Sequence, residues 1–519
     1  MRVRSVDPAT LETVTETDAA NAEAVGVAVA AARAAQPAWA AVPLRERLAR
    51  VGRFGEVLLA RDEAVARLVS REMGKPIPEA YASDLLPTLD AVDWLVSRAA
   101  AVLEPGPFRL RNPILLDRRS QVKRAPRGVV GIIGPWNYPF SLPAIPSLFA
   151  LAAGNAVVLK PSEQTTGTGL LVAEIARAAG FPEDALRVVP GPGEPTGAAL
   201  VEADVDHLVF TGSCEVGARI GRRMAERGVG CSLELGGSDP ALVLADADLD
   251  VAANGILWGR FTNAGQTCAA VKRVLVHESV HDALVERLVD GARRLRLGRG
   301  LEAETDVGPL VDERAAREME TFVQDAVKRG ARVLCGGARP PRQGWFFEPT
   351  VLVDVPRDAR VLHEEVFGPV LPVVRCRDED EMIEAANGTP FGLSASVWTR
   401  DVERGRTLAL RLDAGTVTVN DAAYTYAATE TPWGGVKASG RGRTHGVDGL
   451  LDLTVPRHVN WAPGRRRLAE LWWFPYEADL APTWRRALRW LYGGAAGKAR
   501  ASGALTTALL RKRNLRFRP

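Results

Sequence analysis

The stretch GVVGIIGPWNYP, residues 128–139, decides the fold of this 519-residue chain. Its first half is a short run of β-forming residues without a polar face, and its second half is a turn rich in Gly, Pro and polar side chains. A strand that is apolar on both faces has to be covered on both sides. Three further runs share this pattern, with room for helices between them: residues 156–159, 207–210 and 232–235. The alternation predicts an α/β fold, doubly wound around a parallel sheet.

Each of these predicted strands ends in a polar or glycine-rich turn. The four turns are residues 134–139, 160–163, 211–217 and 236–239. In open α/β sheets, ligands bind outside the carboxyl ends of the strands, so we expect the four turns to form one site. A second α/β segment is expected over about residues 240–430, with strands at 273–277 and 415–420.

The regions before and between these segments follow other patterns. The first hundred residues favour helix, beginning with an alanine-rich run at 20–36. Residues 108–127 mix polar and apolar side chains, which is typical of a hairpin or an arm. The most apolar stretch, residues 141–159, is interrupted by Pro143, Pro146 and Gly154, so we do not expect it to span a membrane.

Composition narrows the class of protein further. The five cysteines form no CxxC pair, which argues against a disulfide framework and a cysteine zinc site, and we expect no metal. The N-terminus has no export signal, so the expected compartment is the cytoplasm. Of the net charge of +3, the segment from 463 to 519 carries +10, with 13 Lys and Arg against 3 Asp and Glu, and the rest carries −7.

Five motifs along the chain give the most specific information. In order they are PWNYP (135–139), LELGG (233–237), GQTC (265–268), EEVFGP (364–369) and PWGG (432–435). Together they resemble the NAD(P)-dependent aldehyde dehydrogenase superfamily, over roughly residues 5–460. The resemblance implies homodimers or homotetramers. It also implies four parts: an NAD-binding domain (1–105 and 127–236), a catalytic domain (237–435), a small β oligomerisation arm (106–126 and 436–460) and an additional tail (461–519).

By resemblance, Cys268 is the nucleophile that attacks an aldehyde, because hydride can leave only after a thiolate has added to the carbonyl carbon. The amide of Asn137 would hold the resulting oxyanion. Glu234 would be the general base that activates water to release the acid. At the end of an apolar run, its pKa should be raised towards neutrality by desolvation. Thiolate formation is left to Glu234, backbone dipoles or the positive nicotinamide of the cofactor.

The cofactor residues also follow from the resemblance. Glu163 would accept from the adenosine ribose hydroxyls and repel a 2′-phosphate, so NAD is favoured over NADP, although Lys160 could help a phosphate. Gly212 would allow close backbone approach to the pyrophosphate at a helix N-terminus. Gln266 should line the site. The full set of predicted cofactor residues is Ile133, Trp136, Lys160, Glu163, Gly212, Ser213, Gly217, Glu365 and Phe367.

Two alternatives and the tail remain open at this point. A CoA-acylating aldehyde dehydrogenase generally lacks the base that Glu234 would supply, and a catalytically silent scaffold at a membrane would not need Cys268 and Asn137. The tail, residues 461–519, is basic and holds five of the twelve Trp residues. We expect it to pack on protein; the alternative is peripheral contact with an anionic membrane through a helical face near residues 484–492. No nucleic-acid partner is expected, because the tail has no nucleic-acid-binding motif.

Overall fold

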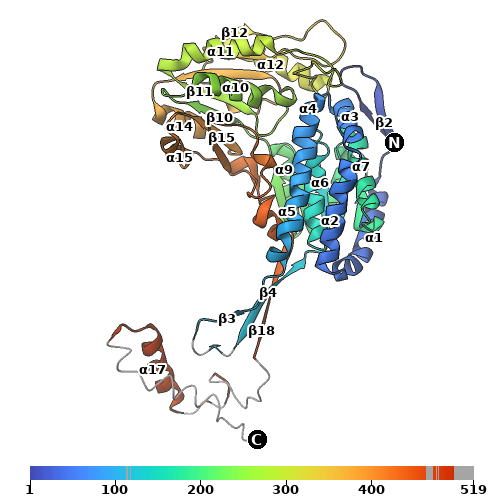
Figure 1. Ribbon diagram of the computed structural model, residues 1–519, viewed down its shortest axis with the longest axis vertical. Coiled ribbons are helices and arrows are strands. Elements are labelled where there is room, and N and C mark those ends of the chain that lie inside the picture. Colours follow the sequence, from blue (N-terminus) through green and yellow to red (C-terminus); the bar gives the residue numbers. More distant parts are fainter. Residues whose placement is uncertain (113–114, 117, 463–471, 475, 477, 496–519) are drawn as a thin grey trace. The chain divides into compact units, whose positions relative to one another are not determined.

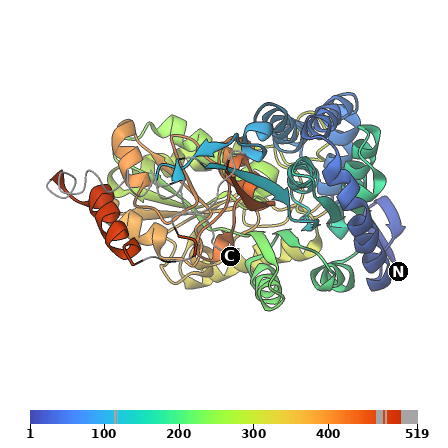
Figure 2. The ribbon, with the colours of Figure 1, turned by 90° about the horizontal axis from the view of Figure 1, so that it is seen from below.

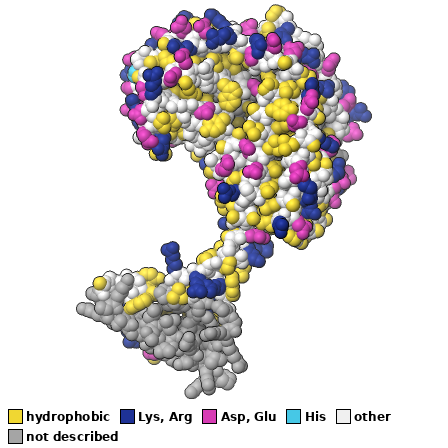
Figure 3. Space-filling view, in the orientation of Figure 1, with side chains coloured by type: hydrophobic (Ala, Val, Ile, Leu, Met, Phe, Trp, Pro, Cys, Tyr) yellow, Lys and Arg dark blue, Asp and Glu magenta, His cyan; other side chains and the backbone are white. Residues whose placement is uncertain are grey.

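The computed structural model describes residues 1–519 except 113, 114, 117, 463–471, 475, 477 and 496–519. It contains two compact units, one formed by residues 1–104 and 124–455, the other by residues 105–123 and 456–519. The larger unit contains two mostly parallel β-sheets with helices packed against them (Figure 1). On the face seen in Figure 3, basic and acidic side chains of this unit are interspersed. The predicted α/β class is confirmed.

The first sheet has six strands in the order β17-β9-β8-β5-β6-β7. All neighbours are parallel except β17, which runs antiparallel to β9. The four strands predicted from the sequence are present, and the two additional ones are only three and two residues long. The strands are β5 (Val129–Ile133), β6 (Ala156–Lys160), β7 (Leu186–Val188), β8 (His207–Thr211), β9 (Gly230–Glu234) and β17 (Gly440–Arg441).

Helices cover both faces of this sheet (Figure 2), and the alternation of side chains along β5 shows why. Val130 and Ile132 belong to one apolar cluster, with α2, α5 and α6. Val129 and Ile133 belong to another, with α1, α8 and α9. A strand that feeds two cores has to be apolar throughout. The helices are α1 (Ala22–Ala41), α2 (Leu44–Leu59), α3 (Asp62–Met73), α4 (Ile77–Ala80), the π turn η1 (Tyr81–Leu85), α5 (Leu86–Leu103), α6 (Ser141–Ala152), α7 (Thr166–Ala178), α8 (Ala198–Glu202) and α9 (Cys214–Glu226).

The order of the strands fixes where a ligand can bind. From β5 the chain proceeds through β6 and β7 on one side, then returns to build β8 and β9 on the other. The topological switch point therefore lies between β5 and β8, where Ile133 pairs with Phe210. In doubly wound sheets this is the position of the ligand crevice.

The second sheet has seven strands, in the order β12-β13-β14-β11-β10-β15-β16, and is parallel except for β12. It is reached directly from β9, since only residues 235–238 separate that strand from β10. The strands are β10 (Asp239–Val243), β11 (Val271–His277), β12 (Arg332–Cys335), β13 (Thr350–Val353), β14 (Val370–Cys376), β15 (Ser394–Trp398) and β16 (Thr416–Val419). The helices are α10 (Leu249–Phe261), α11 (His281–Arg294), α12 (Glu313–Arg329), α13 (Arg360–His363), α14 (Glu379–Asn387) and α15 (Val402–Ala409).

Residues 436–455 differ from the expected arm, because they belong to the larger unit. Gly440 pairs with Glu234 in the six-stranded sheet. Helix α16 (Gly446–Asp452) follows, and Leu450 and Leu453 are buried in the apolar cluster of α2, α5 and α6. Burial of these two leucines explains why the segment stays with the sheet. The chain also begins with a hairpin that was not predicted, β1 (Arg2–Val6) and β2 (Thr13–Asp18).

The smaller unit holds most of a three-stranded sheet, β18-β4-β3, and helix α17. Its elements are β3 (Phe108–Arg109), β4 (Arg119–Pro126), β18 (Thr454–Trp461) and α17 (Leu480–Tyr492). On α17, Ala487 is buried whereas Leu488 and Tyr492 are exposed, so the apolar positions do not share one environment. Most of the predicted basic tail, residues 463–471 and 496–519, lies outside the described residues. Among the described residues, no single helix is long and apolar enough to cross a membrane; the pair α1 and α2 reaches that length and composition only across a bend of 114°.

Candidate active site

Cys268 lies in the loop that leads into β11, at the end of the second sheet where its central strands begin. The Gly236-Gly237 turn lies at this same end. Its side chain is half-buried and packs in a small apolar cluster with Ala269, Leu393, Trp433 and Tyr426. Two aromatic rings from a distant segment, those of Tyr426 and Trp433, therefore pack beside the thiol. The arrangement leaves the sulfur in an apolar setting.

The surroundings of Cys268 oppose thiolate formation, chiefly through burial. Burial raises the pKa of its thiol to about 12, and the carboxylates of Asp239, Glu365 and Glu234 act in the same direction. Lys272 acts in the opposite direction, because an ammonium group favours a nearby thiolate. At neutral pH the thiol is therefore protonated, and any nucleophilic role requires a group that takes its proton or adds positive charge.

Lys272 was not predicted from the sequence, although it is buried at the centre of this site. Its Nζ donates to the carbonyl oxygens of Thr267 (3.1 Å) and Cys268, and lies 3.3 Å from Oε1 of Glu365. The same Glu365 oxygen accepts from the backbone N–H of Gly237 at 3.1 Å. Lys272 thus joins the cysteine loop to two predicted motifs. In the sequence, a charged residue inside the largely apolar strand β11 is the feature that could have indicated this role.

Asn137 lies directly against the cysteine loop. Its side-chain Nδ2 donates to the backbone carbonyl oxygen of Gln266 at 3.1 Å. The backbone carbonyl oxygen of Asn137 accepts from Nδ2 of Asn263 at 2.9 Å. Gln266 is held in turn, since its Oε1 accepts from the N–H of Val311 at 2.8 Å. Among the described residues, only one N–H of the Asn137 amide has an acceptor. The second N–H can serve a substrate oxygen.

Glu234 ends β9, with only 5% of its surface exposed. Neither carboxyl oxygen has a hydrogen-bond partner among the described residues. Burial therefore raises the pKa of Glu234 well above its usual range, with a weaker opposing effect from Arg443. A Cβ on Gly434 would lie 3.0 Å from Oε1, and Gly434 has a φ of 154°, so this neighbour has to be glycine. The predicted raised pKa is confirmed in direction and cause.

Two aromatic rings connect the first sheet to this cluster. Trp136 and Phe367 meet edge to face, with ring centroids 5.5 Å apart. Nζ of Lys272 lies 5.8 Å from the centre of the Phe367 ring. Because Trp136 adjoins Asn137 and Phe367 is two residues from Glu365, the structure places these four predicted residues beside the cysteine loop.

The remaining predicted residues lie at the carboxyl end of the first sheet. Ile133 ends β5, and Gly212 follows β8 across the switch point. Ser213 caps α9 by accepting from the N–H of Val216 at 3.4 Å. A Cβ on Gly217 would lie 2.3 Å from Leu235, so the first turn of α9 packs tightly against the sheet. Close backbone approach at a helix N-terminus suits a pyrophosphate.

Lys160 ends β6, which lies next to β5 in the sheet, and Glu163 follows in the turn after it. Nζ of Lys160 is buried and lies 3.0 Å from Oε2 of Glu163, whose side chain is 43% exposed. An exposed carboxylate held by a buried ammonium can accept from two ribose hydroxyls. The chemistry of these donors and acceptors, with the bare glycine turn before α9, fits a nicotinamide dinucleotide.

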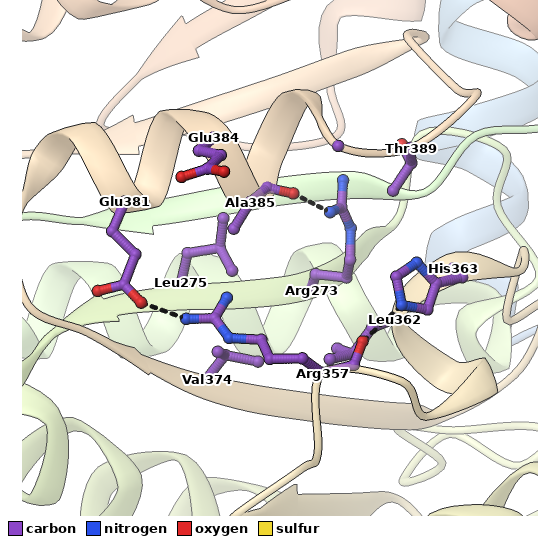
Figure 4. Close-up of a pocket in the computed structure, with 11 residues that line it drawn as sticks. Arg273, Leu275, Arg357, Leu362, His363, Val374, Glu381, Glu384, Ala385 and Thr389 are labelled. Atoms are coloured by element: carbon purple, nitrogen blue, oxygen red, sulfur yellow. Dashed lines mark hydrogen bonds and ion pairs between the residues drawn. The ribbon is translucent and has the colours of Figure 1, made fainter.

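A cavity of about 370 Å³ lies elsewhere on the second sheet (Figure 4). It is bordered by β11, β14, α13 and α14, and its wall includes Arg273, Arg357 and His363. Arg273 donates to the carbonyl oxygen of Ala385 at 2.7 Å, and Arg357 pairs with Glu381 at 2.6 Å. None of the predicted site residues lines this cavity, so it is distinct from the Cys268 site.

The fold and the site together define a class: a two-sheet α/β oxidoreductase that uses a nicotinamide dinucleotide. The aldehyde dehydrogenase family model matches residues 1–459, and the chain belongs to this family. It is 37% identical over 462 residues to a glutarate-semialdehyde dehydrogenase of Pseudomonas putida, covering 87% of this chain and 93% of that protein. It is 38% identical over 458 residues to a putative succinate-semialdehyde dehydrogenase [NADP(+)] 2 of Mycobacterium tuberculosis, covering 86% of each.

Solved structures agree with this assignment. An NAD-dependent aldehyde dehydrogenase from Sinorhizobium meliloti superposes with a TM-score of 0.85 at 38% identity, covering 90% of this chain and 92% of that one. A Mycobacterium tuberculosis aldehyde dehydrogenase complexed with NAD+ gives a TM-score of 0.85 at 34% identity, covering 90% and 95%. The chain is therefore an NAD(P)-dependent oxidoreductase of the aldehyde dehydrogenase family.

Proposed function

We propose that this protein oxidises an aldehyde to the carboxylic acid with NAD, through a covalent intermediate on Cys268, and that water is the final acceptor. The observation that carries the proposal is the carboxyl group of Glu234, buried and without a hydrogen-bond partner among the described residues. A buried polar group left unpaired costs free energy, so its retention beside a half-buried thiol calls for a function.

The first half of the reaction forms the thioester. Glu234 takes the proton of the Cys268 thiol and passes it to solvent, and Sγ bonds to the carbonyl carbon of the aldehyde. The oxygen of the resulting thiohemiacetal carries a negative charge, which the second N–H of the Asn137 amide and the backbone stabilise. NAD+, when bound, supplies a positive charge near the thiol and accepts the hydride that the thiohemiacetal loses. The carbonyl re-forms as a thioester on Cys268.

The second half releases the acid. Glu234, ionised again, takes a proton from water while the water oxygen bonds to the thioester carbon. The C–S bond then breaks, and the Cys268 sulfur leaves as thiolate. Because Glu234 is present, we favour water over coenzyme A as the acceptor. The catalytically silent alternative is not supported by a site in which Cys268, Asn137 and Glu234 are all in place.

The preference for NAD rests on Glu163. Its exposed carboxylate would repel the 2′-phosphate of NADP, whereas buried Lys160 is already paired with it. The relatives point both ways, since one is named for NADP(+) and one structural neighbour was solved with NAD+. Replacing Glu163 with Gln should lower the ratio of kcat/KM for NAD to that for NADP. An unchanged ratio would contradict the role of Glu163.

The function is tested by incubating the protein with NAD and a panel of aldehydes that includes succinate semialdehyde and glutarate semialdehyde. We expect NADH and the acid to form without coenzyme A. Cys268→Ser should reduce the rate by at least about 1,000-fold, because the oxygen nucleophile is far weaker than a thiolate. No NADH with any aldehyde would refute the proposal, and a requirement for coenzyme A would establish the acylating alternative.

A further inference from the structure

Three charged side chains in residues 75–84, two of them buried and one half-buried, have no part in the reaction proposed above. They are Lys75, Glu79 and Asp84, which lie before, within and just after α4, where the helix widens into the π turn η1. Such π turns are uncommon and frequently occur at functional sites. Together these side chains contact both loops that carry the reacting groups.

Asp84 holds the Asn137 loop. Its Oδ1 accepts from the backbone N–H groups of Phe140 (3.0 Å) and Ser141 (3.2 Å), which directly follow the PWNYP motif. Its Oδ2 lies 2.8 Å from Nζ of Lys75, and neither side chain is exposed. The Lys75 ammonium also lies 4.0 Å from the centre of the Tyr138 ring. The ion pair therefore fixes the backbone on the C-terminal side of Asn137.

Glu79 holds the cysteine loop. Its Oε2 accepts from the backbone N–H of Asn263 at 2.8 Å. Asn263 and Ala264 both have a φ of 53°, a left-handed conformation that is strained for a residue with a Cβ. Such strain persists only where the surroundings impose it. The Glu79 carboxylate is one of the groups that impose it here.

The two contacts meet at one side chain. Nδ2 of Asn263 donates to the carbonyl oxygen of Asn137 at 2.9 Å and to that of Gln266 at 3.2 Å. Thus the residue that Glu79 holds is also the residue that joins the two loops. A shift of Asn263 would change the separation between the Asn137 amide and the Cys268 thiol, which have to act on the same carbonyl group.

We propose that Lys75, Glu79 and Asp84 form a clamp that sets the position of the Asn137 loop against the Cys268 loop, with Glu79 as its principal positioning residue. This inference rests on the proposed function, because the relative position of the two loops matters only if both act on one substrate. Positioning errors of about 1 Å can cost about 100-fold in rate.

The electrostatics of Glu79 agree with this placement. Burial raises the pKa of Glu79 to about 7, while Lys75 and hydrogen bonds from Asn263 and Thr262 oppose the rise. The Glu79 carboxyl group is thus costly to ionise, yet it lies where its oxygen accepts a hydrogen bond from the strained cysteine loop.

The test compares Glu79→Ala and Glu79→Gln with Asp246→Asn as a matched control. Asp246 also accepts from backbone N–H groups, those of Arg400 (3.1 Å) and Asp401 (3.2 Å), but it follows the C-terminal end of β10. The cysteine loop adjoins the opposite edge of that sheet. The control therefore replaces a similar carboxylate with an amide, as Glu79→Gln does, at a distance from the reacting groups.

We expect Glu79→Ala to slow the first turnover, measured as the burst of NADH, by about 10- to 100-fold with KM for NAD unchanged. Glu79→Gln keeps an acceptor oxygen and should lose less. Asp246→Asn should keep the wild-type burst. A wild-type burst in Glu79→Ala would overturn the proposal. An equal loss in Asp246→Asn would also overturn it, since it would show a merely structural effect.

A second readout does not require turnover. The rate at which iodoacetamide alkylates Cys268, followed by mass spectrometry, should change severalfold in Glu79→Ala and stay unchanged in Asp246→Asn. Cys214, Cys231 and Cys335 serve as internal controls. If the wild-type protein forms no NADH, the proposed function fails, and this readout still tests the clamp. An unchanged alkylation rate in Glu79→Ala would contradict the clamp by itself.

Discussion

Two buried glutamates in the larger unit differ in what surrounds their carboxyl groups. Both oxygens of Glu72 are satisfied: they accept from the Ser5 hydroxyl, from the N–H groups of Gly167 (2.9 Å) and Thr168 (2.8 Å), and from the Thr168 hydroxyl (2.7 Å). Neither oxygen of Glu234 has a partner among the described residues. Both side chains are 5% exposed or less.

The difference separates a structural from a reactive group. Glu72 joins β1 and α3 to the start of α7, and its hydrogen bonds compensate for the loss of water. Glu234 loses water without that compensation, so it should lower the stability of the fold. A group that costs stability and whose charge acts on a nearby thiol is available for proton transfer, whereas a fully hydrogen-bonded group is not.

The largest expected effect is on turnover. Replacing Glu234 with Gln should lower the steady-state rate by about 100- to 10,000-fold, because it removes the base that activates water. The first equivalent of NADH should also form more slowly, because Glu234 takes the proton of the Cys268 thiol before hydride transfer, but the loss should be largest in the hydrolysis that follows. Stopped-flow measurement of the burst and the steady state distinguishes the two phases. Unimpaired steady-state turnover would show that another group activates water.

The next largest effect is on the stability of the fold, and we expect it when the other glutamate, Glu72, is replaced. Glu72→Gln should lower the free energy of unfolding by about 1–3 kcal/mol, because an amide N–H₂ replaces an acceptor in front of backbone donors. Its kcat should match that of the wild type. Chemical denaturation and steady-state kinetics measure the two quantities. If Glu234→Gln destabilised the protein by as much as Glu72→Gln, the contrast between the two sites would be lost.

The smallest effect is a dependence of stability on pH. Because the pKa of Glu234 is raised in the folded protein, the folded state binds this proton more tightly than the unfolded state does. The resulting contribution is present below the ordinary pKa of 4.5 and is lost as pH rises towards the raised value. The slope from one group is at most about 1.4 kcal/mol per pH unit. Glu234→Gln should flatten this part of the unfolding profile, and an unaltered profile would contradict the burial of an unpaired carboxyl.

The sequence alone predicts those features of the fold and site that depend on neighbouring residues in the chain. The strands that became β5, β6, β8 and β9 are apolar on both faces, and this pattern alone predicts a buried parallel sheet. The motifs likewise identified Cys268, Asn137 and Glu234, which the structure brings into one region. Short strands such as β7 and β17 have too few residues to form a pattern.

What could not be predicted depends on tertiary packing. Lys272 reaches the site because β11 begins beside the Gly236-Gly237 turn, and Glu79 reaches it because α4 lies against the cysteine loop. Residues 436–455 were predicted to belong to the arm, but the burial of Leu450 and Leu453 places them with the first sheet. In each case the partners are separated in sequence by segments whose course the sequence alone does not define.

The short crossing between the two sheets has a mechanical consequence. Residues 235–238, fully extended, span at most about 14 Å. The segment that ends at Ser439, just before β17, forms a second connection between the sheets and lies alongside the first. The backbone carbonyl of Ser439 accepts from the N–H of Leu235 (3.0 Å), and its Oγ accepts from the N–H of Gly392 (2.9 Å). Two adjacent tethers resist both torsion and shear, whereas one would act as a pivot. We therefore expect this protein to work as a stiff frame, in which substrate and cofactor enter through local movements of loops and side chains.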